Sequence, residues 1–134
     1  MAFPVSGGGY QVGDGNESGV LFYIQPAPVA FTTDPAATPA QLAGIAMFIG
    51  TPAAPINFTL PTVAALESAY QAMSEKTNSA FEFIIINTTA NAITVVTNTG
   101  WTVTGGGSVA VTSASARFQA RKTGSGAWQL YRIA

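Results

Sequence analysis

Short β-forming runs separated by turn residues fill the second half of this sequence, and this alternation is the strongest constraint on the fold. The runs span residues 81–87, 93–97, 101–104, 109–112, 116–121 and 128–133. They are rich in β-branched and aromatic residues, whereas Gly, Asn, Ser and Thr dominate the stretches between them. Strands at such close and even spacing predict a mainly β fold, built as an antiparallel β-sandwich or a barrel.

The first part of the chain has a different character. Residues 1–55 contain seven prolines, and six glycines lie between residues 7 and 19. Such density of Gly and Pro breaks regular structure, although the apolar pieces 20–24 and 45–49 are each long enough for one strand. We therefore predict two regions: residues 1–55 as an extended arm with short strands, lying on a neighbouring subunit or another protein, and residues 56–134 as the β-sandwich domain.

One helix is predicted between these regions, from Thr62 to Ser74. Thr62 is a good N-cap, and apolar residues follow at steps of three and four positions. The residues predicted to pack this helix onto the core are Val63, Leu66, Tyr70 and Met73.

The composition narrows the possible functions. Only eleven residues are charged, His and Cys are absent, and the net charge is −1. Sites built from Cys or His, thiol nucleophiles and a Ser-His-Asp triad are therefore excluded, which argues against most enzymes. So small a charge predicts binding neither to nucleic acid nor to an anionic membrane. A surface this poor in charge favours an oligomer or a lattice-bound protein over a free monomer with a neutral, Thr-rich surface.

The apolar strand 81–87 and the distribution of charge along the chain both point to an interface. Ile84 and Ile86 lie on the face of their strand opposite Phe83 and Ile85, so both faces are apolar and both need a cover, either a helix or another subunit.

Residues 1–82 carry six acids and one Lys, a net charge of −5, whereas residues 83–134 carry four basic residues and no acid, a net charge of +4. Arg117 and Arg121 share one face of a predicted strand; they form either a solvated basic strand or a contact with an acidic segment of another subunit.

Other motifs carry less weight. Asp14, Asn16 and Ser18 alternate as in a calcium loop, but the distal Glu is missing and an Asx-rich turn explains them better. The glycines from 7 to 15 have no Lys after them as a phosphate loop requires. The acids show no spacing that selects a catalytic pair. We expect no catalytic, metal or cofactor site, and hence no cofactor.

Residues 58–133 resemble a module of virion proteins from tailed bacteriophages, found in capsid decoration (cement) proteins. The segments that carry the resemblance are Phe-Thr-Leu-Pro-Thr-Val-Ala-Ala-Leu (58–66), Phe-Glu-Phe-Ile-Ile-Ile-Asn-Thr (81–88), Ile-Thr-Val-Val-Thr (93–97), Thr-Gly-Gly-Gly-Ser-Val-Ala-Val (104–111), Ala-Arg-Phe-Gln-Ala-Arg (116–121) and Trp-Gln-Leu-Tyr-Arg-Ile (128–133). This resemblance implies a jelly-roll-like β-sandwich, usually trimeric, bound to the outside of a shell of major capsid protein. Residues 1–57 match no family in this way.

The expectation is thus a virion structural protein that decorates and stabilises a bacteriophage capsid, with the major capsid protein and further copies of itself, as a trimer, as partners. The start of the chain lacks a secretory signal and its longest apolar run, 45–49, is too short to span a membrane, so the protein is expected to be made in the host cytoplasm and to reside on the outer capsid surface. The alternative is a head-fibre or tail module that binds a receptor or glycan through Trp101, Trp128 and Tyr131, although these residues alternate with core positions. The residues assigned to an interface are Phe3, Tyr10, Leu21, Tyr23, Ile84, Ile86, Arg117 and Arg121.

Overall fold

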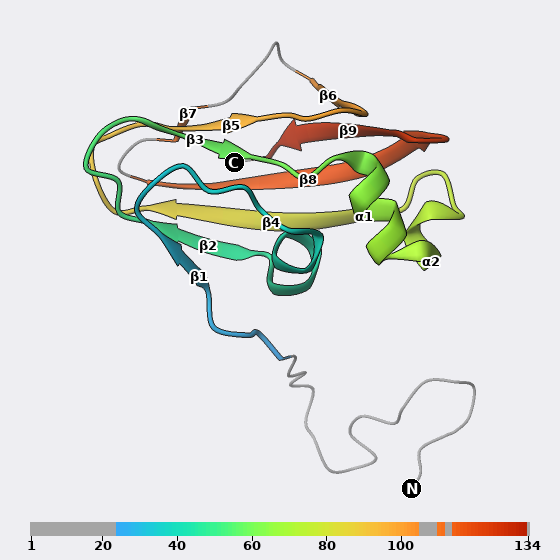
Figure 1. The fold of residues 1–134 in the computed structure, drawn as a ribbon, viewed down its shortest axis with the longest axis horizontal. Coiled ribbons are helices and arrows are strands. Elements are labelled where there is room, and N and C mark those ends of the chain that lie inside the picture. Colours follow the sequence, from blue (N-terminus) through green and yellow to red (C-terminus); the bar gives the residue numbers. More distant parts are fainter. Residues whose placement is uncertain (1–23, 105–109, 112–113, 134) are drawn as a thin grey trace, which may run out of the picture.

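Two β-sheets form the body of the protein in the computed structural model, which describes residues 24–104, 110–111 and 114–133 (Figure 1). The larger sheet has six strands in the order β1-β2-β4-β8-β9-β6, and the smaller has three in the order β3-β5-β7. The strands are β1 (Val29–Phe31), β2 (Met47–Gly50), β3 (Ile56–Thr59), β4 (Ala80–Asn87), β5 (Ile93–Val96), β6 (Trp101–Val103), β7 (Ala110–Val111), β8 (Ser115–Gly124) and β9 (Ala127–Arg132). The prediction of a mainly β fold is confirmed.

The strand pairing is mixed, which departs from the antiparallel prediction. The β4–β8, β8–β9 and β5–β7 pairs are antiparallel, but β1–β2, β2–β4, β3–β5 and β6–β9 are parallel. Parallel neighbours require a long crossover. Residues 32–46 supply it between β1 and β2, and β3 with the helices supplies it between β2 and β4. The local pattern of a strand does not reveal the direction of its neighbour, so the sequence predicted strands without their pairing.

The boundary near residue 55 is not a boundary in the fold. β1 and β2 belong to the six-stranded sheet, and Phe48 on β2 and Leu42 in the segment between the two strands are fully buried in the core. Gly50 shows how closely this segment packs, because a Cβ there would lie 2.7 Å from Ile93 Cδ1. Short apolar pieces between the prolines are therefore sufficient for sheet pairing. Residues 1–23 of the predicted arm lie outside the described residues.

Three short helices connect the strands in the described part of the chain: the π-helix η1 (Ala40–Ile45), α1 (Val63–Ala69) and α2 (Gln71–Ser74). The predicted cap of α1 is confirmed, since Thr62 Oγ1 accepts a hydrogen bond from the Ala65 amide at 3.2 Å. The single helix predicted to Ser74 is interrupted at Tyr70, whose φ of −128° and ψ of 74° are not helical. None of these helices is long or apolar enough to cross a membrane.

The core lies between the two sheets and is built around a cluster of aromatic rings. Phe58 on β3 contacts Phe48 on β2, with ring centroids 4.7 Å apart, so this contact joins the sheets. The cluster continues through Phe83 to Phe118 along the larger sheet, with centroids 5.2 Å apart. Helix α1 closes one end of the core with Val63 and Leu66, both buried as predicted. Tyr70 is half-buried against the core, and the Met73 side chain is outside the described part of the structure.

Candidate functional site

The outer face of the six-stranded sheet is the surface that carries the predicted interface residues. In β2 and β4 the buried residues alternate with half-buried ones that point away from the core. Register brings these outward residues into two rows: Met47 lies beside Ile84, and Ile49 beside Ile86. Ala30 on β1 extends the second row. We name Ala30, Met47, Ile49, Ile84 and Ile86 the outer apolar strip.

The strip is distinct from the core. Half-buried hydrophobic residues that pack against the core come from β1, η1, β3, α1–α2, β4 and β6, and the residues of the strip are not among them. The burial pattern of β4 confirms that Ile84 and Ile86 lie on the face opposite the buried Phe83 and Ile85. What covers their face stays a prediction. Met47 and Ile49 were not predicted to be part of an interface. Their alternation with buried Phe48 was the signal in the sequence, but it became informative only once β2 was known to lie beside β4.

Arg117 and Arg121 lie on the same outer face, as predicted, because Ala116, Phe118 and Ala120 between and beside them are buried. Arg117 is the register neighbour of Ile84 and forms an ion pair with Glu82 at 3.6 Å. Both side chains of this pair are about half exposed, 51% and 44%, so water screens their attraction and the pair adds little stability.

Arg121 is held by neutral partners. Its Nε and Nη2 donate to the Tyr131 hydroxyl at 3.1 and 2.7 Å, and its Nη1 donates to Asn78 Oδ1 at 2.7 Å. No carboxylate lies within ion-pair distance of Arg121 among the residues that the structure describes. The outer face therefore presents a positive charge, fixed in position at Arg121, which lies opposite Ala80 and four residues along β8 from Arg117. The other four predicted interface residues, Phe3, Tyr10, Leu21 and Tyr23, are outside the described residues.

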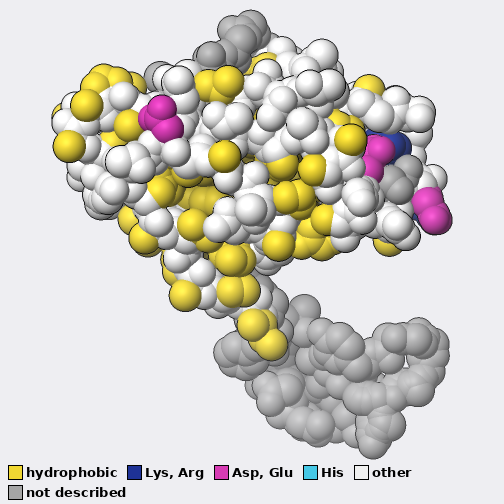
Figure 2. Space-filling model, viewed as in Figure 1, with side chains coloured by type: hydrophobic (Ala, Val, Ile, Leu, Met, Phe, Trp, Pro, Cys, Tyr) yellow, Lys and Arg dark blue, Asp and Glu magenta, His cyan; other side chains and the backbone are white. Residues whose placement is uncertain are grey.

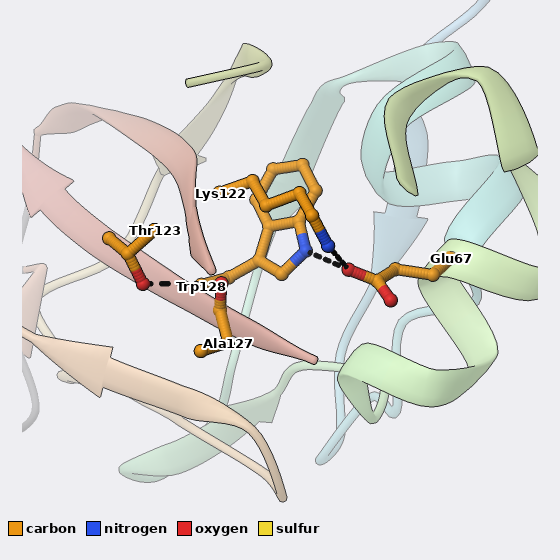
Figure 3. A network of polar contacts seen from close by, with 5 residues as sticks. All are labelled: Glu67, Lys122, Thr123, Ala127 and Trp128. Carbon is orange, nitrogen blue, oxygen red and sulfur yellow. Dashed lines mark hydrogen bonds and ion pairs between the residues drawn. The ribbon is translucent and has the colours of Figure 1, made fainter. Parts of the chain in front are cut away.

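A buried ion pair links helix α1 to strand β8 on the inner side of the sheet (Figure 3). Lys122 is 4% exposed, and its ammonium group donates to Glu67 Oε2. The same carboxylate oxygen accepts a hydrogen bond from Trp128 Nε1 at 2.9 Å. Thr123 Oγ1 donates to the Ala127 carbonyl at 3.2 Å and fixes the adjoining β8–β9 turn. Glu67 thus satisfies two buried donors from two neighbouring strands.

These contacts set the protonation of Glu67. Partial burial of the carboxylate by itself would raise the pKa of Glu67. The hydrogen bonds from Lys122 and Trp128, together with the charge of the ammonium group, outweigh that effect and hold the pKa below its ordinary value. Glu67 is therefore an ionised structural group at neutral pH.

Acidification is expected to weaken the fold through Glu67. Its pKa is lower in the folded than in the unfolded chain, so the unfolded chain takes up the proton more readily as the pH falls. The stabilisation by Glu67 is complete above about pH 5 and is lost as the pH falls through the folded-state pKa. Urea unfolding between pH 7 and pH 3 checks this: the free energy of unfolding should fall less steeply for Glu67→Gln than for the wild type. Equal slopes would contradict the assignment.

The aromatic residues that could serve as a glycan platform lie mostly inside the protein. Trp128 is fully buried and Trp101 is 7% exposed, with its Nε1 donating to the Pro61 carbonyl at 2.8 Å. The prediction that both are core residues is confirmed. Tyr131 is half-buried and holds Arg121. The described residues contain no group of three or more possible metal ligands, and the weak calcium and phosphate motifs at residues 7–19 lie outside them.

Comparisons with known proteins give no further guide to identity. No family model matches the chain, and no curated protein or solved structure matches it either. The resemblance to phage decoration proteins therefore rests on the sequence segments alone.

Proposed function

We propose that this chain is a non-enzymatic structural protein of a bacteriophage particle, which binds the outer surface of the capsid shell and stabilises it. The observation that carries the proposal is the outer apolar strip on a chain with only eleven charged residues. The outward face of a sheet is ordinarily polar, so half-buried apolar side chains on that face favour a protein that works by association. The capsid as the target comes from the resemblance over residues 58–133.

The surface is consistent with this role. Figure 2 shows one face of the molecule, on which charged side chains are few and hydrophobic side chains gather across the middle and lower part. A protein that coats a shell binds in many copies, so each contact can be modest while the sum is large. A homotrimer and a jelly-roll-like connectivity stay predictions from the resemblance. The alternative, a receptor- or glycan-binding module, is less well supported because Trp101 and Trp128 are buried.

Analysis of purified virions of the phage that encodes this chain tests the proposal. We expect the chain to be present at a fixed, high ratio to the major capsid protein, and to be released as intact protein before the shell dissociates. A ratio of only a few copies per particle would instead support a head-fibre or tail component. Absence from virions would overturn the proposal.

A further inference from the structure

The outer apolar strip needs a cover, and the chain itself contains a segment suited to it. Residues 1–23 include Phe3, Tyr10 and the run Val20–Tyr23, which are the apolar residues that such a strip would bind. The same segment carries Asp14 and Glu17 and no basic residue, a net charge of −2. It therefore combines apolar and acidic character in one stretch.

The outer face has the complementary character. Arg117 lies beside Ile84 of the strip and pairs with Glu82, whereas Arg121 lies farther along β8 on the same face, opposite Ala80. Arg121 has neutral hydrogen-bond partners, so its charge favours an acidic segment nearby. The outer face therefore offers residues 1–23 an apolar strip and, farther along β8, the positive charge of Arg121.

The length of residues 1–23 and the place where they join the fold also allow them to cover such a strip. The segment joins the described chain at Ile24, shortly before β1, the edge strand that contributes Ala30 to the strip. Twenty-three residues can extend up to about 75 Å. Crossing the face of another copy from its β1 to its β8 requires only about 14 Å, because neighbouring strands lie about 4.8 Å apart.

The course of residues 24–28 favours a second copy over the chain's own face. All five residues are exposed, Ile24 to 92%, and Figure 1 shows this stretch leading away from the sheets. Its side-chain link to the body is the hydrogen bond from Gln25 Nε2 to the Ile45 carbonyl at 2.8 Å. Pro26 and Pro28 hold the residues before them extended, which opposes a turn back toward the strip.

We propose that residues 1–23 of one copy cover the outer apolar strip of another copy, so that the protein is a homo-oligomer held by exchanged N-terminal segments. The run Val20–Tyr23 packs on Ile84 and Ile86, and the acidic residues Asp14 and Glu17 lie toward Arg117 and Arg121. This inference does not depend on the proposed capsid function, and its test contains no capsid.

Cysteine cross-linking tests the exchange directly, because the natural sequence has no cysteine. Full-length Leu21→Cys and Ile86→Cys, carrying tags of different size, are mixed, equilibrated and oxidised. We expect a disulfide-linked heterodimer on a non-reducing gel. Leu21→Cys mixed with Ser125→Cys, an exposed position in the β8–β9 turn, is the matched control and should give little heterodimer. Equal yields with both partners would overturn the proposal, as would a Leu21→Cys/Ile86→Cys double variant that forms only an internal disulfide.

Light scattering on full-length protein gives a second readout. The wild type should be oligomeric at micromolar concentration, and Ile84→Lys should shift it to monomer. Asn57→Lys adds the same charge at an exposed position of β3 in the smaller sheet and should leave the oligomer intact. Circular dichroism verifies that both variants fold. A monomeric wild type, or a folded Ile84→Lys that stays oligomeric, would overturn the proposal; if Ile84→Lys does not fold, the cross-linking decides.

Discussion

Replacing Glu67 with alanine is expected to lower the free energy of unfolding by about 3–5 kcal/mol at neutral pH, because it breaks a buried ion pair by removing one partner. The Lys122 ammonium group would keep its buried position, at 4% exposure, without the carboxylate that it contacts. Trp128 Nε1 would also lose its acceptor. Urea unfolding followed by tryptophan fluorescence measures the change.

Glu67 and Lys122 are not equivalent, so replacing Lys122 is the control for Glu67→Ala. Lys122→Met should be less damaging than Glu67→Ala, because the remaining carboxylate is 18% exposed and keeps its hydrogen bond from Trp128. The double variant Glu67→Ala/Lys122→Met should be more stable than Glu67→Ala alone, since it leaves no unpaired buried charge. A Glu67→Ala variant within about 1 kcal/mol of the wild type, below the range for a broken buried pair, would contradict this role.

The strands from residue 81 onward and the start of α1 were predicted well, because side-chain alternation and helix capping depend only on neighbouring residues. The runs from residue 81 onward form strands β4 to β9, and Thr62 caps α1 as its side chain requires. The sequence did not predict β1 and β3, which have only three and four residues and lie among prolines. It also did not predict the break at Tyr70, because helical spacing continues through that residue while its side chain packs on the core.

The arrangement of the interface depended on pairing that local patterns do not encode. Ile84 and Ile86 were predicted from β4 alone, whereas Met47 and Ile49 join them only through the parallel β2–β4 register. The Glu67–Lys122 pair spans 55 positions along the chain, so spacing gave no indication of it. One signal was available: Lys122 continues the alternation of Ala116, Phe118 and Ala120 on the inner face, and a charge at such a position requires a partner.

Replacing Leu66 with alanine is expected to lower the free energy of unfolding by about 2–5 kcal/mol, through lost burial and the cavity left behind. Leu66 is fully buried, on the helix that also carries Glu67. The neighbouring turn restricts how far the helix can move to fill the cavity: the Tyr70 amide donates to the Leu66 carbonyl at 3.0 Å, and the Tyr70 ring packs on the core. Equilibrium urea unfolding of the assembled protein measures the loss.

Ser68→Ala is the matched control for this change, because Ser68 lies on the same helix and is exposed. It should alter the free energy of unfolding by no more than about 0.5 kcal/mol, as is usual for surface positions. A loss for Leu66→Ala well below about 2 kcal/mol would show that α1 can collapse into the cavity, and Leu66 would then not be a rigid part of the core. A large loss with an intact ion pair would instead show that the apolar face of α1 and the Glu67–Lys122 pair stabilise the helix separately.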